Sequence, residues 1–282
     1  TIDSFVVEIA SNDGYLLKNF VEANIPCLGI EPTDSTAEAA KKLGIPMRRK
    51  FFGNKLAEEL KVNSKQADLI IGNNVYAHVP DIYDFTLGLK KLLKPAGTIT
   101  LEFAYLLNLI QENEFDTVYH EHFSYLLLHA VKAIFESACL KIYDVEELTT
   151  HGGSLRVYGC HEETAFETTE RVHKQLQKEK DYGLLDMEIY MTFQQKAEKV
   201  KNELLSFLIE QKVQGKTVVG YGAAAKGNTL LNYGGVKPDL VSYVCDAAPS
   251  KQGKYLPGSN IPILLPDIIQ KEKPDYVLIL PW

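Results

Sequence analysis

One short run of the sequence gathers side chains that can exchange protons. Asp116 to Tyr125 carries two histidines, a glutamate and two tyrosines, in the order Tyr119-His120-Glu121-His122-Phe123-Ser124-Tyr125. Because histidine titrates near neutral pH and a neighbouring carboxylate can hold its ring in one tautomer, the run favours proton transfer. Two other interpretations stay open. One is a structural hydrogen-bonding cluster. The other is a metal site, although side chains two apart meet only in an extended segment and no third ligand is evident.

A second group of small and polar residues begins at the end of the first strand-like run. It reads Glu8-Ile9-Ala10-Ser11-Asn12-Asp13-Gly14, and the next strand-like run ends in Glu31. Small residues let the backbone approach a ligand closely, and Gly14 can adopt the turn before a helix. A carboxylate at the position of Glu31 can accept both hydroxyls of a ribose. Each motif alone also fits an ordinary strand-turn-helix, but the pair favours a nucleoside cofactor.

Two cofactors compete for this loop. A dinucleotide places its pyrophosphate against glycines at a helix N-terminus, whereas this loop has Asn12 and Asp13 there. An acidic loop repels pyrophosphate but suits the ammonium and sulfonium groups of S-adenosylmethionine. Asn73 and Asn74 end a later strand-like run and could hold the methionine part, although asparagine is also a plain turn former. The predicted binding residues for S-adenosylmethionine are Glu8, Ala10, Asn12, Gly14, Glu31, Asn73 and Asn74.

Another glycine-containing turn lies near the end of the chain. Gly220-Tyr221-Gly222 precedes a helical pattern with Lys226 in its first turn, and a helix N-terminus with a lysine is a good anion site. It is predicted to hold the diphosphate of a substrate nucleotide, with Asp246 as a ribose carboxylate. The alternative is a turn that serves only packing. The segment His151 to Arg156 either lines a substrate pocket or is a plain hairpin. The predicted substrate-binding residues are Ser154, Arg156, Gly222, Lys226, Asn228, Thr229 and Asp246.

The order of apolar runs predicts an α/β protein. Strand-like runs at 5–10, 26–30, 67–72 and 98–103 alternate with helical patterns, which indicates a doubly wound parallel sheet. A helix at 126–138 and strands at 140–145 and 154–158 follow, and an antiparallel pair of this kind closes the methyltransferase variant of the fold. We therefore expect a Rossmann-like class I methyltransferase domain that binds the cofactor at 1–160.

The rest of the chain is expected to form a helical connector and a smaller domain. Residues 161–212 are charged and helical, and residues 213–282 resume the α/β pattern. Strands are expected at 217–220, 240–245 and 276–280, with helices from 224 and at 266–270. This predicts a second, truncated Rossmann-like domain at 213–282. The chain opens at Thr1 without a methionine and stops directly after a strand, so we expect a fragment of a longer protein.

Composition narrows the functional class. The net charge is −7 and the basic residues are dispersed, which argues against nucleic acid as a partner. No apolar stretch approaches the ~20 residues that span a bilayer, and no signal peptide opens the sequence, so a cytoplasmic protein without a membrane partner is expected. The four cysteines stand singly, which favours buried, inert thiols. A monomer is expected.

The motifs together resemble a known family, the sugar C-methyltransferases that add a branch methyl group to nucleotide-linked 4-keto-deoxysugars. The resemblance covers nearly the whole chain in order. Its joint specificity is high, although each motif alone is weak. The matching pieces are Glu8 to Gly14, Tyr119 to Tyr125, His151-Gly152-Gly153-Ser154-Leu155-Arg156, Gly220-Tyr221-Gly222-Ala223-Ala224-Ala225-Lys226-Gly227-Asn228-Thr229 and Lys251-Gln252-Gly253-Lys254-Tyr255-Leu256-Pro257-Gly258.

The resemblance implies a reaction and roles for individual residues. A carbon beside a ketone becomes nucleophilic only after it loses a proton, so methylation there needs a base and a stabiliser for the enolate oxygen. His122 is the implied base, Tyr119 and Glu121 position it or the substrate, and His78 lies nearby in the pocket. Tyr119 or His78 could donate the hydrogen bond to the oxygen.

The chain departs from the family pattern in one respect. Members usually carry an amino-terminal zinc-binding cysteine module, and this sequence begins after the place where it would lie, so no metal is predicted. Three alternative functions stay open. The first is a methyltransferase that modifies oxygen or nitrogen in another small molecule. The second is a nicotinamide-dependent dehydrogenase, which the missing Gly-x-Gly-x-x-Gly motif disfavours. The third is a protein that binds a nucleotide sugar without catalysis.

Overall fold

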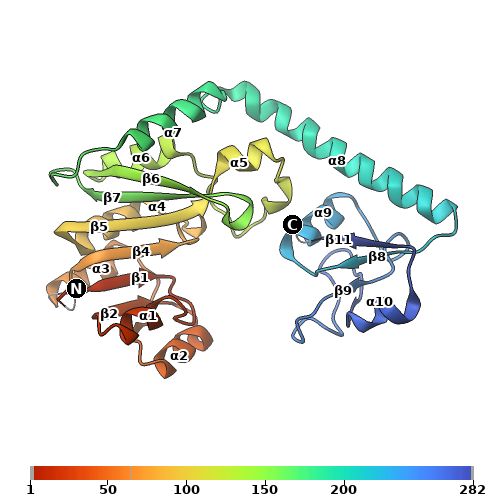
Figure 1. Ribbon diagram of the computed structural model, residues 1–282, viewed down its shortest axis with the longest axis horizontal. Helices are drawn as coiled ribbons and strands as arrows, with labels where there is room; N and C mark the ends of the chain where they lie inside the picture. Colours follow the sequence, from red (N-terminus) through yellow and green to blue (C-terminus); the bar gives the residue numbers. More distant parts are fainter. Residues whose placement is uncertain (1–2, 64, 281–282) are drawn as a thin grey trace. The chain divides into compact units, whose positions relative to one another are not determined.

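The first sheet has mixed direction, with its parallel strands at the centre. In the computed structural model, which describes residues 3–63 and 65–280, β7 runs antiparallel between β5 and β6 and the other neighbouring strands are parallel (Figure 1). The strand order is β3-β2-β1-β4-β5-β7-β6. The expected class I methyltransferase fold is confirmed. The strands are β1 Val6–Ile9, β2 Cys27–Ile30, β3 Met47–Arg48, β4 Ala67–Asn73, β5 Leu93–Ala104, β6 Leu140–Leu148 and β7 Ser154–His161.

Helices cover this sheet and bury its central strands. All four residues of β1 are buried, and Ile70 on β4 and Ile99 on β5 have no exposed surface. Continuous apolar strands are expected where helices cover both faces of a parallel sheet. The helices are α1 Leu17–Glu22, α2 Asp34–Lys42, α3 Asn54–Val62, α4 Ile82–Leu92, α5 Leu106–Gln111, α6 Leu128–Ser137 and α7 Glu170–Asp181, and the 3-10 turns are η1 Tyr76–His78, η2 Phe115–Thr117 and η3 Thr150–Gly152.

The parallel pairing sets where polar loops can lie. Ile9 of β1 pairs with Ile30 of β2, and Asn73 of β4 pairs with Glu102 of β5, so these strands end at one edge of the sheet. The loops that follow β1, β2, β4 and β5 therefore share the carboxyl edge, which is the edge where open α/β sheets bind ligands.

The second sheet is smaller and parallel throughout. Its order is β10-β9-β8-β11, and Leu208, Val244 and Leu256 belong to its buried core. The second Rossmann-like region is therefore confirmed as an α/β unit. The strand expected at 240–245 is shorter, because Leu240 and Val241 donate their N–H groups to Lys237 in a turn. The elements are α8 Met187–Val213, β8 Val218–Tyr221, α9 Ala225–Tyr233, β9 Val244–Cys245, β10 Ile263–Leu264, α10 Asp267–Glu272 and β11 Tyr276–Ile279.

The chain divides into two units that interleave in sequence. One comprises Thr1–Leu109 and Glu121–Leu185, and the other comprises Ile110–His120 and Asp186–Trp282. The expected connector, 161–212, contributes α7 to the first unit and α8 to the second. Burial accounts for this split, because Val172 of α7 is buried in the first unit and Leu208 of α8 is buried in the core of the second. Within residues 3–63 and 65–280, no helix combines the length and apolarity needed to cross a membrane.

Leu208→Ala tests the assignment of α8 to the second unit. Leu208 has no exposed surface, so we expect a loss of about 2 to 5 kcal/mol in the stability of that unit. Hydrogen exchange under mild denaturant should show faster opening of β8 and α9 with the first sheet unchanged. Met191→Ala, at a 71% exposed position of the same helix, is the control and should change little. Faster opening of the first sheet instead would contradict the assignment.

Candidate functional site

The loop after β1 is held in a tight turn. Ala10, Asn12 and Gly14 all have positive φ, at 57°, 51° and 81°. The Ala10 N–H donates to the Ile30 carbonyl at 2.8 Å, which ties the loop to the end of β2. A Cβ on Gly14 would lie 2.3 Å from the Ile45 Cδ1, so both the backbone and the space require glycine there.

Glu31 lies against the same loop, as the sequence predicted for a nucleoside site. Its Oε2 accepts the Asn12 N–H at 3.2 Å and its Oε1 accepts the Thr33 N–H at 2.9 Å. The residue is 7% exposed. Because each carboxylate oxygen has two acceptor positions, each one keeps a position for a ligand hydroxyl.

Two further polar side chains of this region are buried with unsatisfied atoms. Glu8 on β1 is 4% exposed, and burial raises its pKa to about 8. Its Oε2 and the Ser11 Oγ have no hydrogen-bond partner among the described residues. Buried polar atoms in proteins are nearly always hydrogen-bonded, so these two atoms are suited to contact a polar ligand. The protonated Glu8 carboxyl can act as a donor.

The end of β4 brings two more predicted residues to this edge. Asn73 is the last residue of β4, and Asn74 has φ 52° and donates its N–H to the Glu102 carbonyl at 2.8 Å. Asn73 is half-buried and Asn74 is exposed. Their side chains thus lie at the carboxyl edge of the sheet, which also carries the loop after β1.

Three rings of the proton-transfer cluster lie together in the first unit. The His78 and His122 ring centroids are 4.8 Å apart, and those of His122 and Tyr125 are 5.7 Å apart. The His78 Nδ1 lies 2.7 Å from the Glu121 main-chain carbonyl. A carbonyl oxygen only accepts, so Nδ1 carries the proton and the Nε2 of neutral His78 has a free lone pair. His78 can therefore donate from Nε2 only as an imidazolium.

The other residues of the predicted run do not join these rings in one cluster. Glu121 is exposed, and it contacts His78 through its main-chain carbonyl and not through its carboxylate. Tyr119 and His120 belong to the second unit, whereas Glu121 and His122 belong to the first. Among the described residues, no group of three or more His, Cys, Asp or Glu side chains is arranged to hold a metal ion.

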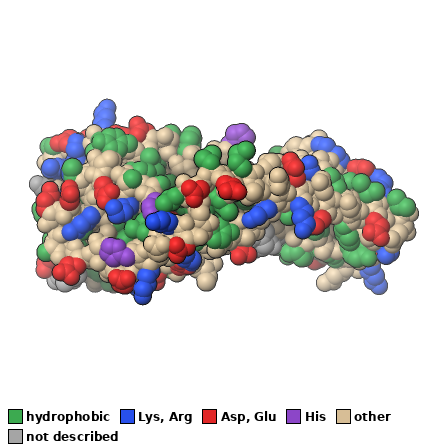
Figure 2. Space-filling model, turned by 90° about the horizontal axis from the view of Figure 1, so that it is seen from above, with side chains coloured by type: hydrophobic (Ala, Val, Ile, Leu, Met, Phe, Trp, Pro, Cys, Tyr) green, Lys and Arg blue, Asp and Glu red, His purple; other side chains and the backbone are tan. Residues whose placement is uncertain are grey.

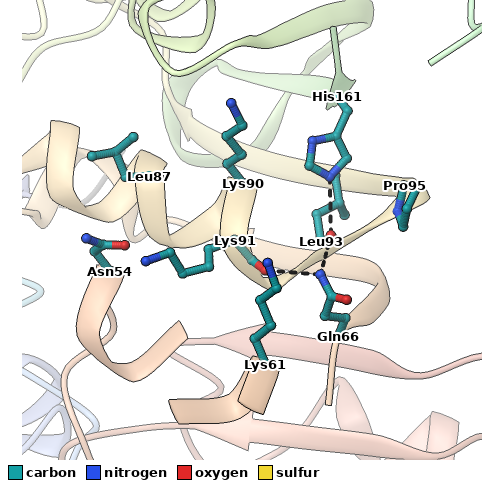
Figure 3. Close-up of a pocket in the computed structure, with 9 residues that line it drawn as sticks. All are labelled: Asn54, Lys61, Gln66, Leu87, Lys90, Lys91, Leu93, Pro95 and His161. Atoms are coloured by element: carbon teal, nitrogen blue, oxygen red, sulfur yellow. Dashed lines mark hydrogen bonds between the residues drawn. The ribbon is translucent and has the colours of Figure 1, made fainter. Parts of the chain in front are cut away.

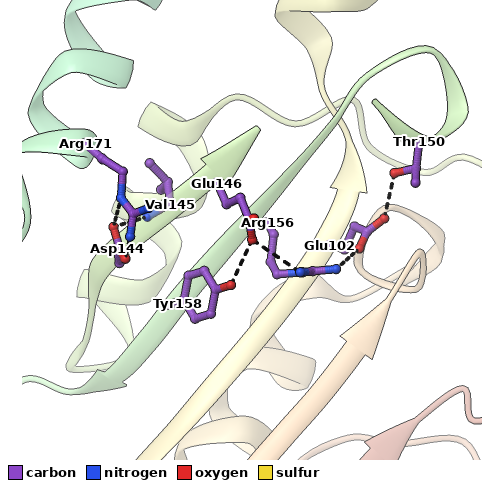
Figure 4. A network of polar contacts seen from close by, with 8 residues as sticks. All are labelled: Glu102, Asp144, Val145, Glu146, Thr150, Arg156, Tyr158 and Arg171. Atoms are coloured by element: carbon purple, nitrogen blue, oxygen red, sulfur yellow. Dashed lines mark hydrogen bonds and ion pairs between the residues drawn. The ribbon is translucent and has the colours of Figure 1, made fainter. Parts of the chain in front are cut away.

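Ser154 and Arg156 have partners within the sheet. Arg156 bonds Glu102 at 2.8 Å and Glu146 at 3.3 Å, and the Thr150 hydroxyl donates to Glu102 at 2.9 Å (Figure 4). The Ser154 hydroxyl donates to the Thr150 carbonyl at 3.1 Å. Because Glu102 is 5% exposed, Arg156 compensates a buried charge. These contacts give both residues a role in the hairpin between β6 and β7.

The glycine turn of the second unit carries a carboxylate that is already hydrogen-bonded. Asp246 accepts the Ala223 N–H at 2.8 Å, the Ala248 N–H at 2.8 Å and the Lys251 ammonium at 3.1 Å. Burial alone would raise the pKa of Asp246, but these three donors hold it below its usual value. Lys251 also donates to the Ala223 carbonyl at 2.9 Å. The sequence reasoning missed Lys251, although it begins one of the quoted motifs.

Two of the predicted residues on α9 differ in their hydrogen bonding. The Thr229 hydroxyl bonds the Ala225 carbonyl within the helix at 3.1 Å, whereas the Asn228 Oδ1 is buried and has no partner among the described residues. Glu114, which the sequence did not single out, is buried in the same unit. Burial raises its pKa to about 7, and the nearby positive charge of Lys226 opposes that rise. An anion at this turn would compete with Glu114 for Lys226.

One cavity of the first unit lies away from the predicted loops. It has a volume of about 570 Å³ and lies between α3, α4 and the start of β5, away from the strand ends that carry the predicted loops (Figure 3). Its Lys91 pairs with Glu58 at 2.8 Å, and its His161 donates to the Leu93 carbonyl at 3.2 Å. None of the predicted site residues lines it. On the face seen in Figure 2, basic side chains are interspersed with acidic ones.

The buried Glu8 predicts a pH dependence of stability. Folded Glu8 keeps its proton up to about pH 8, whereas the unfolded residue releases it near 4.5. Stability should therefore fall as the pH rises from 4.5 to 8, by up to about 1.4 kcal/mol per pH unit from this group. Glu8→Gln, which stays uncharged, should remove this contribution in denaturation curves at pH 5 to 8. Glu22→Gln, on the surface, is the control, and equal pH slopes in Glu8→Gln and the parent would contradict the prediction.

Sequence comparisons identify relatives along the whole chain. The family model described as "Methyltransferase domain" matches residues 3–145, and the model described as "C-methyltransferase C-terminal domain" matches residues 149–282. The second match begins in the hairpin before β7, so it includes a strand of the first sheet. The C-methyltransferase NovU of Streptomyces niveus is 35% identical over 282 residues, which are 100% of this chain and 67% of the relative.

Solved structures resemble the chain only distantly. The magnesium protoporphyrin IX methyltransferase ChlM of Synechocystis PCC 6803 with bound SAH is 13% identical, with a TM-score of 0.45 over 56% of this chain and 74% of that one. The PH0226 protein of Pyrococcus horikoshii is 12% identical, with a TM-score of 0.46 over 56% of this chain and 82% of that one. The assignment therefore rests on the sequence matches. By the two family models and the 35% identity over its whole length, the chain belongs to the C-methyltransferase family.

Proposed function

We propose that this C-methyltransferase moves a methyl group from S-adenosylmethionine to the carbon beside the ketone of a nucleotide-linked 4-keto-deoxysugar, with thymidine diphosphate as the nucleotide. The observation that supports this chemistry best is the His78–His122 pair, with ring centroids 4.8 Å apart. A base near neutral pH is what removal of a proton beside a ketone requires.

The residues at the carboxyl edge of the first sheet fit S-adenosylmethionine. Glu31 has one acceptor position left on each oxygen for the ribose hydroxyls, and Glu8 and Ser11 offer buried atoms that lack partners. Asn73 and Asn74 are the proposed partners of the methionine part. When bound, this cofactor supplies an electrophilic methyl group. The protein's part is to hold the acceptor carbon close and aligned.

His122 is the proposed base that removes the proton beside the ketone. It is half-buried and its ring contacts the rings of both His78 and Tyr125, which limits its orientations. Neutral His78 has its lone pair on Nε2, so it accepts a hydrogen bond more readily than it donates one. Of the two donors that the family resemblance implies for the enolate oxygen, the Tyr119 hydroxyl donates without needing a charge.

The turn Gly222 to Thr229 is the proposed diphosphate site of the second unit. Gly222 has φ 92°, and α9 follows with Lys226 in its first turn. The unsatisfied Asn228 Oδ1 adds a polar atom to this region. Asp246 is the proposed ribose partner. Lys251 holds it ionised beside the turn, which keeps it an acceptor.

Lys226→Ala should weaken binding of dTDP-glucose, and added salt should weaken it in the parent. Because Glu114 competes for Lys226 and has a pKa of about 7, affinity should rise as the pH falls from 8 to 6. The two phosphates of dTDP-glucose keep a constant charge over this range. Glu114→Gln should bind more tightly at pH 8 and lose the pH dependence in calorimetry. Unchanged affinity in Lys226→Ala would remove the turn from the substrate site.

His122→Ala tests the base. With dTDP-4-keto-6-deoxyglucose in deuterated water, the parent should exchange or methylate the carbon beside the ketone. The variant should lose both activities by about a hundred- to ten-thousandfold. Its affinity for S-adenosylhomocysteine should not change, whereas Glu31→Ala should weaken that affinity by about 1 to 3 kcal/mol.

The pattern of losses in His122→Ala separates the possible roles. Loss of methyl transfer with exchange preserved would place His122 after proton removal and make His78 the leading base. Retention of both activities would leave the cluster a structural role. Equal affinity of Glu31→Ala and the parent would exclude Glu31 from the cofactor site.

A further inference from the structure

A carboxylate outside the predicted site is fully buried and fully hydrogen-bonded. Glu179 on α7 is 0% exposed. Its Oε1 accepts the Tyr105 hydroxyl at 2.7 Å and the Leu128 N–H at 2.6 Å. Its Oε2 accepts the N–H of His129 at 3.1 Å and its Nδ1 at 2.6 Å. A carboxylate offers about four acceptor positions, so the four donors saturate Glu179.

Glu179 caps the N-terminus of α6. The residue at the usual capping position is Leu127, which makes no side-chain cap bond. The first N–H groups of a helix have no partner within the helix, and a negative charge there also interacts favourably with the helix dipole. The cap therefore comes from α7, about fifty residues later in the chain.

Tyr105 connects the same carboxylate to the end of β5. It is 1% exposed, and the Gln175 side chain donates to its hydroxyl at 3.0 Å, which leaves the hydroxyl proton for Glu179. Burial, and then the charge of Glu179, raise the pKa of Tyr105 above its usual range, so it stays a donor. The backbone of Tyr105 pairs with Leu126, and the Leu106 N–H donates to the Leu126 carbonyl at 3.1 Å.

These contacts hold the segment that directly follows His122. On one side, the N–H groups of Phe123 and Ser124 donate to the Ala77 carbonyl at 2.9 and 3.2 Å, beside His78. On the other side, the segment from Leu126 to His129 is bound to Tyr105 and Glu179. With the Glu121 carbonyl also bound to His78, residues 121–124 are held against η1, and 126–129 are held by Tyr105 and Glu179.

We propose that Glu179 is a positioning residue for C-methylation. By fixing the segment from Leu126 to His129, it sets where His122 and Tyr125 lie relative to His78. This inference rests on the proposal that these rings form the reaction centre. Glu179 itself touches no reacting atom, because all its acceptor positions are taken by the protein.

Glu179→Gln is the direct test. Glutamine keeps the shape but replaces one acceptor oxygen with an NH₂ group that faces N–H donors. We expect kcat with dTDP-4-keto-6-deoxyglucose to fall about 10- to 100-fold, the loss that a displacement of roughly 1 Å causes. KM for S-adenosylmethionine should not change, because its proposed loop follows β1. Hydrogen exchange of the amides at 123–129 should become faster.

Val172→Ala on the same helix is the matched control. Val172 is 1% exposed, and its truncation should lower Tm without removing a hydrogen bond from Leu128 or His129. It should keep both kcat and the slow exchange of residues 123–129. If the two variants lose kcat in proportion to their loss of Tm, Glu179 only stabilises the fold and the inference is wrong.

Two more variants keep the inference falsifiable. Tyr105→Phe removes one donor to Glu179 and should lower kcat less than Glu179→Gln does. If Glu179→Gln does not fold, an unchanged kcat and exchange pattern in Tyr105→Phe would overturn the inference.

His122→Ala separates the positioning role of Glu179 from the proposed role of His122 as the base. If it keeps activity while Glu179→Gln loses kcat, the base assignment is wrong and Glu179 acts on the reaction through a group other than His122. If it is inactive while Glu179→Gln matches Val172→Ala, only the positioning role is wrong.

Discussion

The covered parallel sheet is the constraint on which the rest of the first unit depends. Its central strands are buried, so they carry mostly apolar residues, and the buried Glu8 and Glu102 stand near the carboxyl ends of β1 and β5. Polar groups gather where the strands end, and parallel strands end at one edge. Asn12, Glu31 and Asn74 therefore lie at the same edge although they are distant in sequence. The loop with His78 follows the same rule, since η1 comes directly after β4.

The buried carboxylates of the first unit show how surroundings decide the role of one chemical group. Burial alone raises the pKa of Glu8 to about 8, so Glu8 is a neutral donor at pH 7. Glu102 is paired with Arg156, and Glu179 is bound by four donors. The first has unsatisfied atoms that a ligand can use, whereas the other two hold strands and helices in place.

The connection after β5 shows that neighbours in sequence need not share a folded unit. Ile110–His120 belongs to the second unit, where η2 packs on α9. There burial raises the pKa of Glu114, and the positive charge of Lys226 opposes that rise. The chain returns to the first unit at Glu121. The run from Tyr119 to His122 is thus divided: Tyr119 and His120 belong to the second unit, and Glu121 and His122 belong to the first. His122 gains its close partner, His78, from a different loop.

The sequence alone determined the fold class, the family and the position of the loop after β1 and of Glu31 at one edge of the sheet. Each has a local signal: alternating apolar runs, contiguous motifs, and small or acidic residues directly after a strand. The tertiary structure decided which side chains meet. Tyr105 and Glu179 are 74 residues apart, and Glu179 stands in a charged helix whose pattern predicts a solvated face. The short strands β3 and β10 and the division of α7 from α8 were likewise missed. Such features depend on contacts between segments far apart in the chain, for which the residues themselves carry no periodic or spacing signal.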